Sequence, residues 1–314
     1  MKRNVIRRDE MLGAPLELGG TPITLDEYAT TGLLAVAIGP RGNGKTNAGL
    51  LMAEQLSVQG WVSVLIDPEA ELESLYGDAV ADPDMLRNAL AKRDQAILVV
   101  NATDAGEFVP YGRAILDVAD QYRKPIFVVI DEGQLFSASR KRSNGIGEAA
   151  DIINEFAERG RKRALDLFIT ALRYTGTLQR TLFANKNLTL IGWQEDPTAW
   201  SALAPQFKAS KIDFADLNAL TPGEFFCLSR HGVEKIRMPM AAALRAVAPK
   251  AKPVAKTLPA TFNQWTRAMS AIPTERLVAL SEDVVGLLST VAELSPQQIL
   301  AGQSAHQDEL EART

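Results

Sequence analysis

The sequence is poor in the residues that build disulfides and transition-metal sites. It has one cysteine, Cys227, and two histidines, His231 and His306, in 314 residues. One thiol cannot form an intrachain disulfide framework or a cysteine-based zinc site. The two histidines are widely separated, so any metal chemistry falls to carboxylate and phosphate oxygens. Redox and zinc enzymes are therefore set aside as function classes.

Long apolar runs are also missing. No run reaches the roughly 18 residues of a membrane-spanning helix, and the basic residues 1–10 are not followed by the apolar stretch of a secretory signal. We therefore expect a cytoplasmic protein. The net charge of −4 argues against a uniformly basic nucleic-acid coat but is compatible with a locally basic channel inside an assembly.

Residues 39–46 form the most informative segment of the chain. They read Gly-Pro-Arg-Gly-Asn-Gly-Lys-Thr and match the phosphate-binding pattern G-x-x-x-x-G-K-[ST]. The apolar run at 33–38 has the length of a buried strand, and residues 47–59 carry apolar side chains at helical spacing. A strand in front and a helix behind is the context in which this pattern binds phosphate. The sequence therefore predicts an ATP site and disfavours the alternative of a glycine-rich turn without a ligand.

The residue types of this loop suit phosphate chemistry. The glycines allow close approach of the backbone, so that N–H groups point at the β-phosphate, and the helix N-terminus adds a partial positive charge. Lys45 is expected to bridge the β- and γ-phosphates, and the Thr46 hydroxyl to bind Mg²⁺. The predicted nucleotide contacts are Gly39, Pro40, Arg41, Gly42, Asn43, Gly44, Lys45, Thr46 and Asn47.

Strand-like apolar runs alternate with helical segments along the chain, which is typical of a parallel α/β sheet. We expect strands at 33–38, 61–66, 96–100, 125–130, 165–170 and 188–193, followed by two short strands at 224–229 and 233–238. The predicted helices between them include 114–122 and 149–158. The sheet domain is expected to end near residue 240.

The run at 125–130 stops at Asp131-Glu132. An acid at the carboxyl end of a buried strand lies where open α/β sheets bind ligands, so Asp131 is expected to hold Mg²⁺ through its water shell. Glu132 is expected to orient and deprotonate the attacking water. Two strand-like runs separate Lys45 from Asp131, which favours a RecA-like ATPase with a strand interposed between the phosphate strand and the acid strand. The alternative is an acidic pair that merely ends a strand.

Four stretches resemble the HerA and FtsK superfamily of ring-forming DNA-translocating ATPases, and HerA-like members in particular. They are LGGTPITLD (18–26), WVSVLIDPEAEL (61–72), VVIDEGQLF (128–136) and LNALTPGEFFCLSRHGVEKIRMP (217–239), and the likeness spans residues 15–240. The resemblance implies a RecA-like P-loop NTPase that forms a homo-oligomeric ring and has double-stranded DNA as its partner. It also implies that the ring is a hexamer. HerA-like proteins commonly carry an N-terminal β-barrel, whereas only 17 residues precede Leu18 here. We therefore expect the ATPase domain without that barrel.

The resemblance also suggests residues that act on the γ-phosphate. The strand after the acid strand usually ends in a polar sensor, often glutamine. Here it ends Ile-Thr-Ala-Leu-Arg, which leaves Thr170 and Arg173 as sensor candidates. The segment Arg-Gly-Arg-Lys-Arg at 159–163 resembles a family stretch whose arginine reaches the neighbouring subunit's nucleotide. Arg161 and Arg163 are the first candidates for this trans-acting finger, then Arg159; a solvated helix end is the alternative.

A second basic cluster follows the acid strand. Arg140, Lys141 and Arg142 precede a Ser-Asn-Gly-Ile-Gly stretch. In a ring this loop could line the pore and contact DNA phosphates without reading bases. An exposed loop with solvated charges is the alternative.

The predicted domain organisation has five parts. They are an N-terminal arm (1–17), a RecA-like ATPase domain (18–240), an extended Ala/Pro/Lys linker (241–260), a helical C-terminal segment (261–302) and a disordered tail (303–314). Leucines and valines at heptad spacing over 277–294 predict an amphipathic helix there. This helix packs on its own chain or docks a neighbouring subunit or an effector such as a nuclease.

Two function classes remain. The first is an ATP-hydrolysing ring motor that moves double-stranded DNA in genome packaging, conjugation, or nuclease-coupled processing or defence. The alternative is a non-motor P-loop ATPase that acts as a nucleotide switch or assembly factor for a protein partner.

Overall fold

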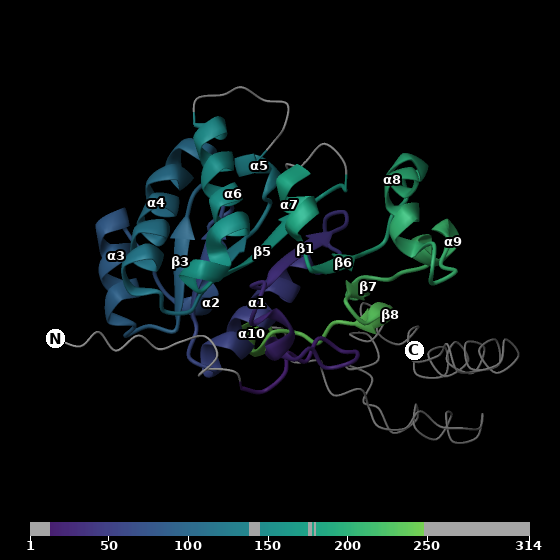
Figure 1. Ribbon diagram of the computed structural model, residues 1–314, viewed down its shortest axis with the longest axis horizontal. Coiled ribbons are helices and arrows are strands. Elements are labelled where there is room, and N and C mark those ends of the chain that lie inside the picture. The colour runs from purple at the N-terminus through teal and green to yellow at the C-terminus, as the bar shows by residue number, and fades with distance from the viewer. Residues whose placement is uncertain (1–12, 138–144, 175–177, 179, 248–314) are drawn as a thin grey trace, which may run out of the picture. The chain divides into compact units, whose positions relative to one another are not determined.

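The fold is built on one mostly parallel sheet (Figure 1). The computed structural model describes residues 13–137, 145–174, 178 and 180–247, all within the first of two compact units, Met1–Ala248 and Pro249–Thr314. The described residues form eight strands: β1 (Leu34–Ile38), β2 (Val62–Asp67), β3 (Ile97–Asn101), β4 (Ile126–Ile130), β5 (Leu165–Ala171), β6 (Leu188–Ile191), β7 (Glu224–Ser229) and β8 (Gly232–Arg237).

The strand order is β3-β2-β4-β5-β1-β6-β7-β8. The pairs among β1 to β6 are parallel, and β7 and β8 join the edge antiparallel. β5 lies between β1 and β4, with Leu167 paired to Leu34 on one side and to Val128 on the other. The expected RecA-like sheet is therefore confirmed, and the strand that separates the phosphate strand from the acid strand is β5.

Helices connect the strands. They are η2 (Leu25–Tyr28), α1 (Lys45–Val58), α2 (Glu73–Tyr76), α3 (Pro83–Lys92), α4 (Ala105–Tyr122), α5 (Gln134–Ser137), α6 (Ile146–Arg163), α7 (Arg180–Asn185), α8 (Pro197–Phe207), α9 (Phe214–Asn218) and α10 (Ala242–Val247). No helix among the described residues is long and apolar enough to cross a membrane.

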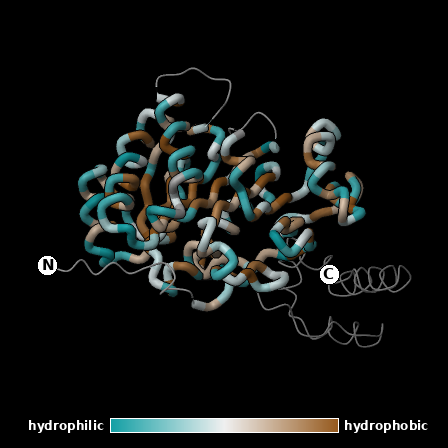
Figure 2. The backbone as a smooth tube through the Cα atoms, viewed as in Figure 1, coloured by the Kyte–Doolittle hydropathy of each residue, from teal (hydrophilic) through white to brown (hydrophobic). Residues whose placement is uncertain are grey.

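The two faces of the sheet carry separate cores, because successive strand residues point to opposite faces. Leu34, Val36 and Ile38 of β1 pack in one core with α3, α4 and α6. Ala35 and Ala37 pack in the other with α1 and the chain before β1. The apolar strands lie inside, between polar outer helix surfaces (Figure 2). Burial on both faces explains why these strands read as continuous apolar runs.

Helix α1 lies close against the sheet. A Cβ placed on Gly49 would stand 2.8 Å from Val129 Cγ1 and 2.9 Å from Phe168 Cδ1. Only a glycine allows this approach, because real side-chain atoms do not pack that closely. The start of α1 is therefore held at a fixed height above β4 and β5, the strands that carry the acidic pair and Thr170.

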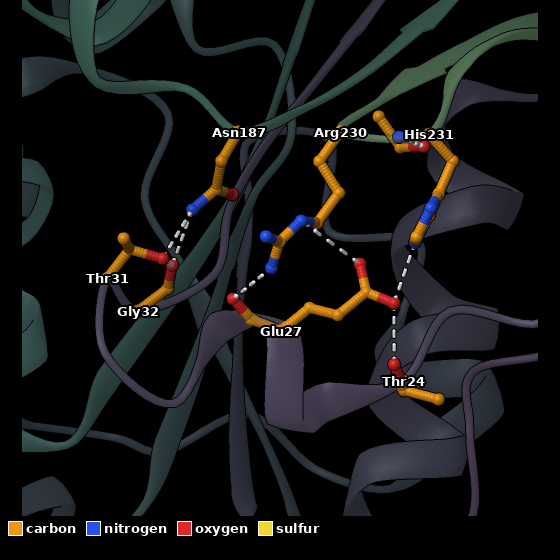
Figure 3. A network of polar contacts seen from close by, with 8 residues as sticks. Thr24, Glu27, Thr31, Gly32, Asn187, Arg230 and His231 are labelled. Carbon is orange, nitrogen blue, oxygen red and sulfur yellow. Dashed lines mark hydrogen bonds and ion pairs between the residues drawn. The ribbon is translucent and has the colours of Figure 1, made fainter.

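Polar contacts join the β7–β8 hairpin to the chain before β1 (Figure 3). His231 Nε2 lies 2.8 Å from Glu27 Oε1, and Arg230 Nε lies 4.0 Å from Glu27 Oε2. Thr24 Oγ1 donates to the same Glu27 Oε1 at 2.6 Å. Burial acts to raise the pKa of Glu27, but the hydrogen bonds from Thr24 and His231 and the charges of His231 and Arg230 hold that pKa below its usual value.

Several predicted boundaries are corrected. Helix α4 begins at Ala105, well before residue 114, because the Asp104 side chain caps it by accepting from Glu107 N. Pro110 lies inside the helix. The predicted extended linker at 241–260 is helical at its start, where Glu54 accepts from the N–H groups of Ala242 and Ala243 and caps α10. The N-terminal arm joins the fold from Leu16, which pairs with Ile23.

Other predictions concern residues outside the described part of the chain. These are the first twelve residues of the arm, the basic loop with Arg140, Lys141 and Arg142, the linker from residue 248 onward, the helical segment 261–302 and the tail 303–314.

Candidate nucleotide-binding site

The phosphate loop joins β1 to α1 as the sequence predicts. It runs from the end of β1 at Ile38 to the first residue of α1, Lys45. Gly42 and Gly44 have φ angles of 76° and 91°, in the left-handed region that favours glycine. The Lys45 side chain is buried and turns back across the loop, with its Nζ donating to the Pro40 carbonyl at 2.8 Å. Burial lowers the pKa of Lys45, while Asp131 and Glu132 act to raise it.

The loop is supported from the β6 side by two other glycines. The Asn43 side chain is 1% exposed. A Cβ on Gly192 would stand 1.4 Å from Asn43 Oδ1. Gly192, which follows β6, pairs by its N–H with the Ile38 carbonyl at 2.8 Å, and Gly223 N–H donates to the Asn43 carbonyl at 3.0 Å. Any side chain at 192 would therefore overlap the Asn43 side chain in its present position.

The Asn43 amide is also unusual in its environment. Its Oδ1 and Nδ2 are buried and have no hydrogen-bond partner among the described residues. Buried amides normally have partners, and leaving one without costs about 1–3 kcal/mol. This polar side chain inside the phosphate loop supports a site that is completed by a ligand.

The acidic pair lies beside the loop. The Thr46 hydroxyl donates to Asp131 Oδ2 at 2.7 Å, so the end of β4 and the start of α1 meet directly. The Thr170 hydroxyl donates to the other oxygen, Asp131 Oδ1, at 2.6 Å and accepts from Glu132 N–H at 2.9 Å. Thr170 on β5 thus orients both residues of the pair. The two carboxylate oxygens of Asp131 therefore contact two threonines, Thr46 of α1 and Thr170 of β5.

Glu132 has a strained backbone. Its φ is 45°, in the left-handed region that non-glycine residues seldom adopt. The neighbouring Gly133 N–H donates to the Thr170 carbonyl at 2.9 Å, so β5 holds the turn on both sides of Glu132. The carboxylate of Glu132 lies 3.6 Å from the Arg41 guanidinium of the phosphate loop. This contact places the carboxylate at the loop instead of in open solvent.

The oxygens of Thr46 and Asp131 fit a Mg²⁺ site. Mg²⁺ takes oxygen ligands and is commonly held by one or two protein groups together with phosphate and water. A hydroxyl and a carboxylate that already meet at 2.7 Å, next to a phosphate loop, supply such a pair. The residues present are therefore suitable for the metal that the sequence predicts.

The other candidates lie in different places. Arg173 follows the carboxyl end of β5, at the same end of the parallel strands as Asp131. Arg163 ends α6 at the opposite end of the strands, where it is 12% exposed and paired with Glu155 at 3.0 Å and with Asp120. The side chains of Arg159 and Arg161 lie outside the described part of the structure, as do Arg140, Lys141 and Arg142.

Comparison with known proteins gives matches of structure and not of sequence. No family model and no curated protein matches the chain. The genome packaging NTPase B204 from Sulfolobus turreted icosahedral virus 2, in complex with AMPPCP, matches with a TM-score of 0.51 and 15% identity over 67% of this chain and 100% of B204. VirB4 of Thermoanaerobacter pseudethanolicus matches with a TM-score of 0.54 and 11% identity over 73% of this chain and 98% of VirB4.

The chain has the fold of a RecA-like P-loop NTPase. The two solved structures share this fold at low sequence identity, and the fold agrees with the one that the resemblance in sequence implies. The P-loop NTPase fold explains why the phosphate loop, the acidic pair and Thr170 meet. They lie at the carboxyl ends of the adjacent strands β1, β4 and β5.

Sequence reasoning missed the glycines that support the phosphate loop. Gly192 and Gly223 lie some 150 residues or more from Asn43 in the chain and contact it only after the sheet has formed. A glycine near the end of the predicted strand 188–193 was the one available signal, and it is a weak one. Thr170 was named with Arg173 as a sensor candidate, which stays a prediction; the structure adds its contacts with Asp131 Oδ1 and Glu132 N–H.

Proposed function

We propose that the protein is a Mg²⁺-dependent ATPase that works as a ring-forming motor on double-stranded DNA. The observation that carries the proposal is the joint placement of Thr46, Asp131 and Thr170 with Glu132 at the phosphate loop. A loop that only bound phosphate would not need a carboxylate held next to it in a strained turn.

The residues have distinct roles in this proposal. Lys45 neutralises charge on the β- and γ-phosphate oxygens, and the loop N–H groups hold the triphosphate. Thr46 and Asp131 hold Mg²⁺, which supplies positive charge to the phosphate oxygens when it is bound. Glu132 orients a water molecule and takes its proton. Thr170 orients the Asp131 carboxylate and holds the backbone of Glu132. The guanidinium of Arg41, which is 78% exposed, lies 3.6 Å from the Glu132 carboxylate and holds it beside the loop.

The ring supplies an arginine from a neighbouring subunit. Such an arginine neutralises transition-state charge and makes hydrolysis depend on assembly. We assign this role to Arg161 or Arg159. Arg163 is held by Glu155 and Asp120 of its own chain, and to act in trans it would have to break two ion pairs.

The motor reading draws on the fold and the sequence together. B204 is a genome packaging NTPase, and the whole length of B204 matches 67% of this chain in fold. The basic residues Arg140, Lys141 and Arg142 directly follow the acidic strand and α5, which places them in sequence where a pore loop would contact DNA phosphates. A protein that holds duplex DNA through its phosphates binds with little sequence preference, and its affinity falls steeply as salt is raised.

The deciding experiment is ATP hydrolysis by the purified full-length chain with and without duplex DNA. We expect hydrolysis to rise on addition of duplex and to fall back as salt is increased. Replacing Arg140, Lys141 and Arg142 together by alanine should remove the DNA stimulation and flatten the salt dependence while basal hydrolysis stays nearly intact. Hydrolysis that ignores duplex of any length would favour the alternative, a nucleotide switch or assembly factor for a protein partner.

A further inference from the structure

A short segment after β8 lies directly against the first turn of α1. Asn47, the second residue after Lys45, donates from Nδ2 to the Pro239 carbonyl at 2.9 Å and accepts at Oδ1 from Ala241 N–H at 2.8 Å. The nitrogen and the oxygen of the Asn47 side-chain amide thus hold the residues on either side of Met240. Met240 is therefore fixed beside the phosphate-binding turn.

Met240 is exposed, whereas Met238 and Ala241 on either side of this segment are buried. Its relative exposure is 48%, whereas Met238 is 7% and Ala241 0% exposed. Large apolar side chains that stay exposed are few among the described residues, namely Val58, Met85, Leu135, Met240 and Val247. Of these, Met240 is the one that hydrogen bonds anchor to α1 at its phosphate-binding end. An apolar side chain held in this place fits an apolar part of a ligand.

The two flanks of the α1 start differ in chemistry. Thr46 faces Asp131 on β4, which marks the side of the terminal phosphate and the hydrolytic carboxylates. Asn47 is the next residue, about 100° further around the helix, and it faces the segment after β8. In the strand order, β4 and β8 lie on opposite sides of β1. A nucleotide whose terminal phosphate lies at Glu132 therefore carries its nucleoside toward Met240.

We propose that Met240, held by Asn47, is the contact for the nucleoside half of the nucleotide. This inference rests on the proposed ATP site and adds to it the residue that receives the part of the ligand beyond the phosphates. The flexible thioether packs against the flat face of a base or the carbon side of a ribose. Met240 thus contributes affinity for a nucleotide and none for bare phosphate.

The test compares two ligands on the full-length protein. ATP carries the nucleoside, and inorganic tripolyphosphate carries the phosphates alone; both are titrated with Mg²⁺ by calorimetry. We expect Met240→Ala to weaken ATP binding about five- to tenfold, the loss of roughly half a buried methionine, and to leave tripolyphosphate binding unchanged. Met240→Leu should keep ATP affinity within about twofold, because the apolar volume is retained.

Met85 offers a matched control. It is 53% exposed and lies on α3, so Met85→Ala should change neither affinity. Unchanged ATP binding in Met240→Ala, or equal weakening of ATP and tripolyphosphate, would overturn the assignment. A wild-type protein that binds neither ligand would instead reject the proposed nucleotide site itself, so the two failures can be told apart.

Discussion

At the scale of single residues, the candidate site depends on how side chains are oriented. Asp131 has each carboxylate oxygen bonded to a different threonine hydroxyl, from Thr46 and Thr170. Glu132 sits in a left-handed turn that Thr170 holds through its hydroxyl. Pre-oriented groups of this kind are what phosphoryl transfer requires, because its catalysis is mostly positioning and electrostatics.

Replacing Glu132 by glutamine should separate binding from turnover. The amide keeps the shape of the side chain but cannot take a proton, so we expect ATP affinity to be retained and the turnover rate to fall about a hundredfold or more. Equilibrium binding and steady-state hydrolysis measure the two quantities. Glu17→Gln, an exposed carboxylate far along the chain, serves as the control and should hydrolyse normally. Wild-type turnover in Glu132→Gln would remove the role we give this residue.

Thr170→Val should lower turnover more than binding. Valine has the same shape but no hydroxyl, so Asp131 loses a donor, and Glu132 N–H loses one of its two acceptors and keeps Asp131 Oδ1. We expect folding to be kept at a cost of about 1–3 kcal/mol for the two hydrogen bonds that are lost. Thr170→Ser should restore turnover because it returns the hydroxyl. If serine failed to rescue while both variants melted like the wild type, Thr170 would not be a positioning residue.

At the scale of elements, the phosphate loop depends on strands that are distant in sequence. The end of β6 and the turn before β7 contact Asn43, and η2 is joined to the β7–β8 hairpin through Glu27 and His231. The antiparallel edge strands thereby support a loop that belongs to the parallel part of the sheet. Changes at this edge should therefore reach the nucleotide site.

Gly192→Ala should disrupt nucleotide binding without touching the nucleotide. Its new Cβ would overlap Asn43 Oδ1, so the Asn43 side chain must leave its buried position and disturb the phosphate loop. Shortening the opposing side chain in the double variant Asn43→Ala/Gly192→Ala should recover much of the ATP affinity, which calorimetry would measure. Gly147→Ala on α6 is the control, because nothing lies within 4 Å of the added Cβ. Independent, additive effects of the two substitutions would contradict the steric explanation.

Glu27→Gln should lower thermal stability in a pH-dependent way. The pKa of Glu27 in the folded protein lies below its ordinary value of 4.5, so its contribution is fully present above about pH 4.5 and is lost as pH falls through the folded pKa. Thermal melts from neutral pH to about pH 3.5 should show the difference between wild type and variant shrinking at the acid end. Glu71→Gln, an exposed carboxylate, should show no such trend. A difference that stayed constant with pH would exclude the ionised pair as its source.

At the scale of the whole molecule, the described domain holds the phosphate loop and the Asp131-Glu132 pair at the carboxyl ends of the parallel strands. The arginine cluster lies at the amino ends, where α6 leads into β5. A residue at the amino ends of the strands lies across the sheet from the chain's own nucleotide site, so it can reach a nucleotide only if that nucleotide is bound to another copy. The arrangement is thus consistent with the proposed ring, in which each site is completed by its neighbour.

Mixing two inactive variants tests this arrangement. Lys45→Ala cannot use its own nucleotide, and Arg161→Ala cannot complete a neighbour's site. We expect each to be inactive alone and the mixture to recover part of the wild-type hydrolysis, because some interfaces join an intact loop to an intact arginine. Repeating the mixture with Arg159→Ala or Arg163→Ala in place of Arg161→Ala identifies which arginine acts in trans. A monomer with full specific activity at high dilution would contradict the trans arginine and the ring.

The sequence alone was sufficient for the parts that depend on neighbouring residues. An octapeptide with a strand before it and a helix after it predicts the phosphate loop, and continuous apolar runs predict a parallel sheet buried on both faces. Asp131 and Glu132 were identified by their place at the end of such a run. Each of these signals is local, because strand burial and phosphate binding need only a few consecutive residues of the right type.

The tertiary structure decided the parts that depend on residues far apart in the chain. It placed β5 between the phosphate and acid strands, so that Thr170 meets Asp131, and it brought Gly192 and Gly223 against Asn43. It also extended α4 through Pro110 and made the start of the predicted linker helical, since Glu54 on α1 caps α10. These features follow from packing between distant segments, and no window of the sequence contains both partners.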